Sequence, residues 1–344
     1  MLEGKELILA TKPFAQEDRA KSWLYFITTL ALWLGAYAGI FVFLSYPIVA
    51  LAFGVLVALL NVRLFTIYHD YLHKSILQKS FIANAIFTLY GLYSLTPVSI
   101  WKRSHDYHHS HNSKLYTTSI GSFPIVTRNK FLSASPGQRR LYLFIRHPLA
   151  IFFGYLFMFV YGMCIRSLLS NPRKHADSLL ALVVHYMVAG LMFWFFGWQG
   201  LLLGFVFPFL LAHAMGAYLF YAQHNFPSAT FEDKEGWTYI GAALRASSYM
   251  KMHPIMHWFT GNIGYHHIHH VNARIPFYRL PEVYAHFPEF QNPGLTSLRP
   301  ADIWACLRLK VWDPESQRMI GMKELKSLAP ARPERVGSTQ SAVR

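Results

Sequence analysis

The chain has 344 residues, of which 53% are hydrophobic and only 14% are charged. Soluble domains carry about 25% charged residues, so the composition favours an integral membrane protein. Lysine and arginine outnumber the acidic residues by 32 to 17. Nucleic-acid-binding domains place such a charge on a fold without long apolar runs, so no nucleic-acid partner is expected and the basic excess suits an anionic membrane surface.

The ends of the chain and its cysteines add little chemistry. Residues 1–22 carry both charge signs and lack the apolar core of a signal peptide, which predicts a cytosolic N-terminal segment. Cys164 and Cys306 are far apart and form no CxxC or zinc-type spacing. Neither a disulfide framework nor a thiolate metal site is therefore expected.

Four apolar segments are long enough to cross a membrane, which takes about 20 residues each. Residues 23–44 contain no charge, and residues 47–67 follow after a short turn. Residues 178–221 contain no Asp, Glu, Lys or Arg and have GWQG at 197–200, so they are expected to form a helical hairpin. The predicted fold is all-α and polytopic, with about four transmembrane helices.

Whether two shorter apolar stretches, 81–98 and 149–165, cross the membrane is decided by the topology of the whole chain. If three histidine clusters share one site, an even number of crossings must separate them, so both stretches should stay at the surface or re-enter. Basic residues then gather on the histidine side, which by the positive-inside rule is cytoplasmic together with both termini. These residues are Lys102, Arg103, Lys114, Arg128, Lys130, Arg139, Arg140, Arg146, Arg173 and Lys174.

We expect one membrane domain over residues 23–300, carrying the histidine clusters on a cytosolic cap. Residues 301–344 are expected to form a cytosolic C-terminal segment. Its last stretch, LAPARPERVGSTQSAVR from Leu328, has too little apolar content to order itself.

Eight of the 18 histidines fall into three patterns with helical spacing. Successive residues of an α-helix turn by about 100°, so positions i, i+3 and i+4 share one face. By the same geometry His267 and His111 point away from these faces and are expected to support the ligands or lie on the surface. The patterns are His69-x3-His73, His105-x2-His108-His109 and His266-x2-His269-His270.

This histidine count exceeds what one ion needs, since a closed zinc site takes only four ligands. Two ions with open positions account for it better, and imidazole suits iron, copper, nickel and zinc. Asp70 and Asp106 each follow the first histidine of a pattern and are candidates to orient the rings. Single interfacial histidines are commonly not ligands, but three matching patterns favour a metal site.

The three histidine boxes, with YAQHNFP (221–227) and TGNIGYHHIHH (260–270), resemble the membrane-bound fatty acid desaturases, especially bacterial acyl-lipid enzymes of the delta-5 and delta-12 type. The resemblance covers roughly residues 20–300. It implies two iron ions held by the eight box histidines, with His224 as a ninth ligand. Where acyl-CoA desaturases have an asparagine that holds one iron through water, this chain has Phe220, so the tenth position is unassigned.

The resemblance also implies an oxygen-dependent reaction that introduces a cis double bond into a long acyl chain. The chain would lie in an apolar tunnel, which aromatic residues of 23–44 and 192–198 could line. No glycine motif for flavin or NAD and no HPGG of a fused, haem-binding cytochrome b5 domain is present, so a ferredoxin-like or cytochrome b5-like donor is expected. The basic loop 102–146 could dock it, although lipid contact explains the same charges.

Two alternatives remain open at this point. A hydroxylase or ketolase of the same superfamily, acting on an alkane, sphingolipid or carotenoid, would have similar boxes. A metal transporter or sensor would place ligands near the bilayer midplane, where His185 and His213 lie, but helix packing is the favoured role of these two. His253 and His257 form another i, i+4 pair and are expected on a cytosolic helix rather than at a metal.

Overall fold

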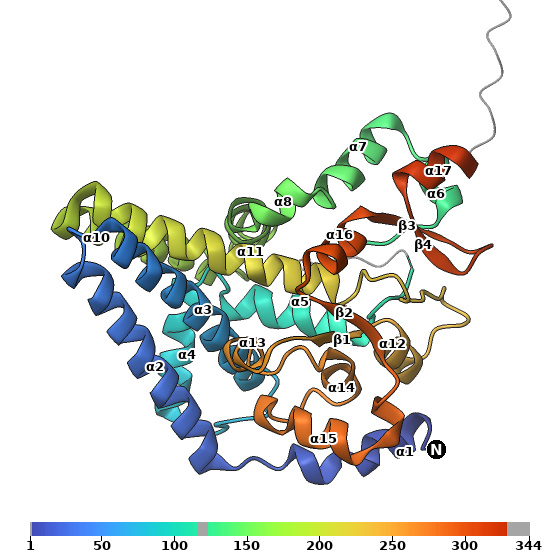
Figure 1. Cartoon of the computed structure of the whole chain (residues 1–344), viewed down its shortest axis with the longest axis horizontal. Helices are drawn as coiled ribbons and strands as arrows, with labels where there is room; N and C mark the ends of the chain where they lie inside the picture. The colour runs from blue at the N-terminus through green and yellow to red at the C-terminus, as the bar shows by residue number, and fades with distance from the viewer. Residues whose placement is uncertain (1, 116–122, 329–344) are drawn as a thin grey trace, which may run out of the picture.

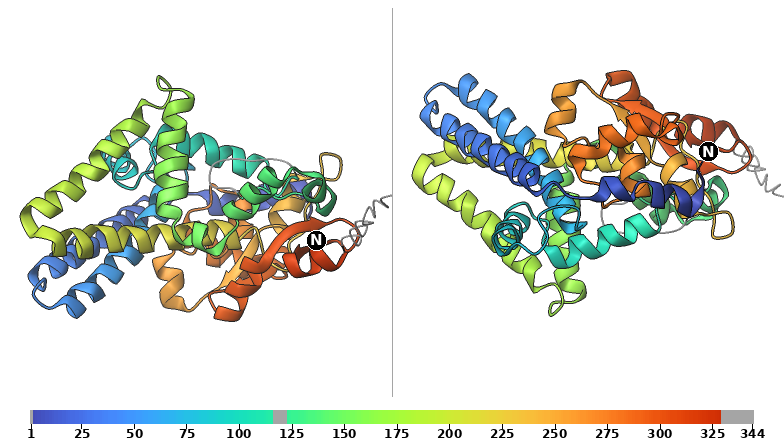
Figure 2. Two further views of the ribbon diagram at one scale, coloured as in Figure 1. Left: turned by 90° about the horizontal axis from the view of Figure 1, so that it is seen from above. Right: turned by 90° about the horizontal axis from the view of Figure 1, so that it is seen from below.

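The computed structural model describes residues 2–115 and 123–328, and within them the chain is mostly helical, as expected (Figure 1). Long apolar helices extend to one side of the molecule, and shorter elements gather in a head at the other side (Figures 1 and 2). The histidine boxes lie where these two parts meet.

The first hairpin joins α2 (Arg19–Val42) to α3 (Pro47–Leu72). The Asp18 side chain caps α2 by accepting the backbone N–H of Lys21 at 3.1 Å. With 24 and 26 residues, the helices are about 36 and 39 Å long, which exceeds the thickness of a bilayer core. The predicted helices are confirmed, and α3 continues beyond the expected end at residue 67 so that it carries the first histidine box.

The second hairpin is formed by α10 (Ala176–Leu201), the π-helical stretch η3 (Leu202–Val206) and α11 (Phe207–Ala222). Gly197 breaks the helix with φ 62° and ψ −160°, a region that only glycine adopts without strain. Figure 2 shows the two limbs diverging from this turn. The GWQG turn is therefore confirmed, and α11 returns the chain to the head.

The two ambiguous stretches form bent or short helices. A bend of 89° separates α4 (Phe81–Tyr93) from α5 (Val98–Ser110), which carries the second histidine box. The π-helical η2 (Tyr155–Ile165) continues into α9 (Arg166–Ser170) and packs against α10 and α11. Together η2 and α9 have fewer residues than the roughly 20 that a span needs.

The head holds two short sheets that the all-α prediction missed. Strand β1 (Ser248–Lys251) pairs parallel with β2 (Gly294–Ser297), and β3 (Leu309–Asp313) pairs antiparallel with β4 (Arg318–Gly321). All five residues of β3 are buried, so the alternation typical of a half-exposed strand is absent. The helices of the head besides α5 are α1 (Gly4–Ala10), η1 (Lys12–Ala15), α6 (Arg128–Ser133), α7 (Pro136–Ile145), α8 (Pro148–Phe152), α12 (Tyr239–Arg245), α13 (Pro254–Phe259), α14 (His266–Val271), η4 (Phe277–Arg279), α15 (Leu280–His286), η5 (Pro288–Phe290), α16 (Pro300–Arg308) and α17 (Met322–Leu328).

The segment after residue 300 packs onto the same head. Cys306 of α16 and Trp312 of β3 are buried in one hydrophobic cluster with Ala222, the last residue of α11, and Phe226, which follows this helix. Beyond Leu328, the tail that the sequence predicts to be disordered lies outside the described residues. The domain boundaries at residues 22 and 300 stay predictions.

Candidate metal centre

Nine histidines converge at the junction of the long helices and the head, and they form two groups. Within each group the candidate ligand nitrogens all lie within 4.8 Å of one another. All of the rings except those of His73 and His224 are buried. The five-histidine group is His69, His73, His105, His109 and His269, and the four-histidine group is His108, His224, His266 and His270.

The five-histidine group is held by α3, α5 and α14. The Nε2 atom of His69 lies 2.8 Å from Nε2 of His105 and 3.2 Å from Nε2 of His73. The Nε2 atom of His109 lies 3.1 Å from those of both His105 and His269. Three helices that are distant in sequence therefore direct the same ring atom to one point.

The four-histidine group adds the residue that follows α11. The Nε2 atom of His224 lies 3.1 Å from Nε2 of His108 and 2.9 Å from Nε2 of His266. The Nε2 atoms of His266 and His270 are 3.1 Å apart. His224, which the resemblance alone identified, thus joins the box histidines.

Each of the two later boxes serves both groups. On α5 the i, i+4 pair His105 and His109 belongs to the five-histidine group, whereas His108 belongs to the other group. On α14 the pair His266 and His270 belongs to the four-histidine group, and the intervening His269 belongs to the first. Helical periodicity predicted the shared face correctly, but not this division between two centres.

The donor set fits a metal cation. The Nδ1 atom of His224 donates to the carbonyl oxygen of Ala246 at 3.0 Å, and Nδ1 of His69 donates to Oδ1 of Asp70 at 3.2 Å. A neutral imidazole has only one N–H, so Nε2 of both rings presents a lone pair toward its neighbours. Lone pairs from several rings directed at one point are stabilised by a bound cation.

Burial keeps the rings in the neutral form that binds metal. It lowers the pKa of His224 to about 4. The pKa values of His269 and His270 fall well below the usual range, because burial and then the neighbouring imidazoles disfavour the charged ring. Protonation therefore does not compete with a metal near neutral pH.

Asp70 and Asp106, which the sequence treats alike, occupy different environments. Asp70 is 1% exposed; its carboxylate contacts His69 and accepts the backbone N–H of Phe277 at 2.7 Å. Asp106 is exposed on α5 and forms an ion pair with Lys102. The structure therefore brings Asp70 to the centre, but it does not bring Asp106 there.

His267 lies outside both groups, as its helical position predicts, but it is not a surface residue. Its side chain is fully buried, and Nε2 donates to the carbonyl oxygen of Phe290 at 3.1 Å. This bond joins α14 to η5, the short 3₁₀ helix that precedes β2. His111, at the end of α5, stacks on Tyr107 with ring centroids 4.0 Å apart and also lies outside the groups.

The other histidines considered from the sequence have structural contacts. His253 accepts the backbone N–H of Ile255 at the start of α13, and His257 stacks on Tyr265. The ring nitrogens of His185 and of His213 contact groups within the helical packing. Their partners are Tyr93 and Tyr155 for His185, and Ser94 and Phe209 for His213.

The TGNIGY segment (260–265) forms the loop that precedes α14 and fixes the direction of this helix toward the metal centre. Gly261 has φ +55°, and a Cβ atom there would lie 2.7 Å from Cγ2 of Thr66, so a side chain would push the loop away from α3. The Thr66 hydroxyl donates to the Thr260 carbonyl at 3.1 Å, and Gln223 Nε2 donates to the Ile263 carbonyl at 3.0 Å. Sequence analysis missed Thr66 and Gln223, although polar residues near the ends of apolar helices were the available signal.

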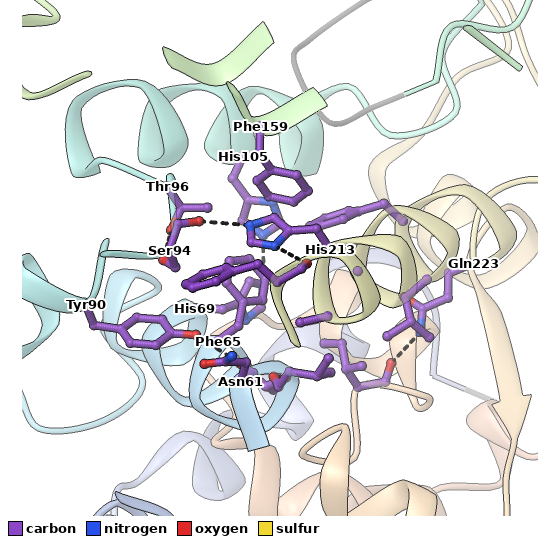
Figure 3. A pocket seen from close by; sticks show the side chains of 18 of the residues that line it. Asn61, Phe65, His69, Tyr90, Ser94, Thr96, His105, Phe159, His213 and Gln223 are labelled. Carbon is purple, nitrogen blue, oxygen red and sulfur yellow. Dashed lines mark hydrogen bonds between the residues drawn. The ribbon is translucent and has the colours of Figure 1, made fainter. Parts of the chain in front are cut away.

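A cavity with a mostly apolar lining adjoins both groups. Figure 3 shows Phe65, His69, His105 and His213 converging on it. His69 and His105 come from the five-histidine group, and His266 of the four-histidine group also lines it. Its walls come mainly from α3, α11 and residues 90–96, and none of its lining residues lies in 23–44 or 192–198. The expectation that aromatic residues of those two segments line an acyl tunnel stays a prediction.

Adjacent residues of α14 provide a direct test of the metal assignment. We expect His266→Ala to lower the metal bound per chain, since it removes one of four converging nitrogens. His267→Ala should retain the metal and lose about 1–3 kcal/mol of stability, because a buried hydrogen bond is broken. Metal analysis and thermal unfolding of both purified variants measure this difference; equal metal loss would contradict it.

The two aspartates provide a second matched pair. Asp70→Asn weakens the acceptor that polarises His69, so metal affinity should fall roughly 10- to 100-fold. Asp106→Asn changes only an exposed ion pair and should leave metal affinity unchanged. Competition with a chelator gives both affinities, and an effect of similar size in the two variants would show that Asp70 has no special role.

Comparisons with known proteins agree with this site. The model of the fatty acid desaturase family matches residues 44–299. A fatty acid desaturase of Bacillus subtilis is 29% identical over 340 residues, which are 96% of this chain and 95% of that protein. An sn-1 acyl-lipid omega-3 desaturase (ferredoxin) of Synechocystis is 28% identical over 63% of this chain and 61% of its own length. A chloroplastic omega-6 fatty acid desaturase of spinach is 24% identical over 71% of this chain and 54% of its own length. The chain therefore belongs to the fatty acid desaturase family.

Proposed function

We propose that the protein is an oxygen-dependent acyl-lipid desaturase that introduces a cis double bond into a long acyl chain. The observation that carries this proposal is the cavity, which is apolar over most of its surface and still reaches histidines of both groups. An acyl chain needs an apolar site, and the reacting carbons must lie beside the metals. The cavity meets both needs.

We assign two iron ions to the nine histidines, one to each group. Bound iron would supply the oxidative chemistry, in which two hydrogens from adjacent methylenes, O₂, two electrons from a donor and two protons yield two water molecules and the double bond. Side chains alone cannot do this, since an unactivated methylene offers no acidic proton. Phe220, four residues before His224 in the chain, brings no donor atom, so a non-protein ligand would complete the four-histidine group.

The protein's own contribution is to position the rings and to exclude water. Asp70 orients His69, and the carbonyl of Ala246 orients His224. Phe65, Phe159 and Phe209 line the cavity with hydrocarbon, which favours an acyl chain over water. The loop from Thr260 to Tyr265 sets the position of α14 and hence of its three histidines.

The proposed topology has four membrane-crossing limbs, namely α2, α3, α10 and the segment of η3 and α11. The histidine groups and both termini lie on the cytoplasmic side, where the basic residues concentrate. The bent pair α4 and α5 would begin and end on the cytoplasmic side without crossing the membrane, in keeping with the 89° bend between the two helices. Reduced ferredoxin or a cytochrome b5-like protein would deliver electrons from the cytoplasm, by analogy with relatives whose names specify ferredoxin.

Expression in a bacterial host with a known lipid profile tests this function. We expect new monoenoic or dienoic chains in membrane lipids, detected by gas chromatography with the position of the double bond determined from derivatives. The His105→Ala variant should produce none, because it removes a nitrogen from the five-histidine group. Hydroxylated chains would instead indicate a hydroxylase, and an unchanged profile with a reduced donor present would contradict the proposal.

A further inference from the structure

A second cavity borders the four-histidine group. Its lining includes His108 and His224 of this group together with the polar side chains of His111 and Lys114, and it is more polar than that of the first cavity. Polar groups of this kind can hold water, whereas an apolar cavity tends to remain dry. We therefore call it the polar cavity, to distinguish it from the apolar one.

Among the described residues, Phe220 is the one side chain that lines both cavities. It lies in the last turn of α11, four residues before His224. Its ring centroid is 5.5 Å from that of Trp101, 6.2 Å from that of His105 and 6.4 Å from that of Phe65. Phe220 thus belongs to a cluster of aromatic rings packed against the five-histidine group.

The neighbours of Phe220 hold it in this place. Trp101 is 1% exposed and stacks on His105, with ring centroids 5.0 Å apart and planes inclined by 13°. Phe65 meets Trp101 edge to face at 5.1 Å. Each such aromatic contact contributes about 0.5–1.5 kcal/mol beyond its buried area, so the ring has a defined position between the cavities.

We propose that Phe220 is a partition that keeps the water of the polar cavity from the acyl chain at the metal centre. The inference rests on the proposed function, because it assigns the apolar cavity to the acyl chain. Removing the ring joins the two cavities beside His105. Electrons from the donor are then partly diverted to hydrogen peroxide, as O₂, two electrons and two protons combine without oxidation of the chain.

Phe159 supplies a matched control. It lines only the apolar cavity, is 3% exposed, and packs against His213 rather than against a histidine of either group. Phe159→Ala therefore enlarges the apolar cavity by the same side-chain volume as Phe220→Ala, but without opening it to the polar one. Phe220→Met keeps an apolar side chain of similar length and should restore the partition.

The first measurement does not depend on turnover. Stearic acid with a nitroxide at carbon 10 is bound to the full-length protein loaded with diamagnetic zinc in D₂O, and the deuterium modulation of its spin echo reports nearby water. We expect modulation to rise about twofold in Phe220→Ala because water enters the joined cavity. It should stay at the wild-type level in Phe159→Ala and Phe220→Met, and equal modulation in all four proteins would overturn the partition.

The second measurement counts double bonds formed per O₂ consumed, with peroxide assayed in parallel. This ratio should fall several-fold in Phe220→Ala and recover in Phe220→Met. A fall in overall rate at constant ratio would overturn the inferred role. If the wild type forms no double bond, the proposed function fails, whereas the nitroxide measurement still decides whether Phe220 separates water from the apolar cavity.

Discussion

The structure depends on the convergence of nine imidazoles in two groups, in which neighbouring Nε2 atoms lie 2.8 to 3.2 Å apart. Lone pairs that face each other repel, and a cation bound between them turns this repulsion into attraction. Before a cation binds, rigid supports are needed to hold the rings in place. The protein provides them with α3, α5, α14 and the end of α11, and with acceptors that fix the opposite nitrogen of His69 and His224.

The position of this centre follows from the lengths of the helices. Since α3 continues to Leu72, His69 and His73 lie just beyond the apolar part of the helix. The sharp bend between α4 and α5 brings the second box across the same region, and the loop after α13 directs α14 toward it. The apolar cavity between α3 and α11 consequently ends at the imidazole rings. An apolar space and a polar centre are therefore in direct contact.

Helical periodicity predicted much of this site, because ligand spacing depends only on local geometry. It identified the face of each box and excluded His267, yet it could not divide the boxes between two groups, which depends on how α5 and α14 pack. It also could not distinguish Asp70 from Asp106. Both follow a box histidine, but α3 is enclosed at this level while α5 keeps an exposed face.

Other features escaped prediction because they arise from tertiary contacts. The strands are only four or five residues long, and β3 is buried along its whole length, so it shows no alternating pattern. The burial of His267 follows from packing against residues near Phe290, which no local pattern reveals. The cavity lining likewise comes from residues of α3 and α11 that face one another only after the two hairpins associate, so the composition of a single segment cannot identify it.

The division of the nine histidines into two groups is the central claim, and iron quantitation combined with Mössbauer spectroscopy of the purified full-length protein tests it most directly. The account predicts two iron ions per chain in distinguishable nitrogen-rich environments, one with five histidines and one with four. A single iron per chain, or two that both persist after His224 and His266 are replaced by alanine, would contradict it.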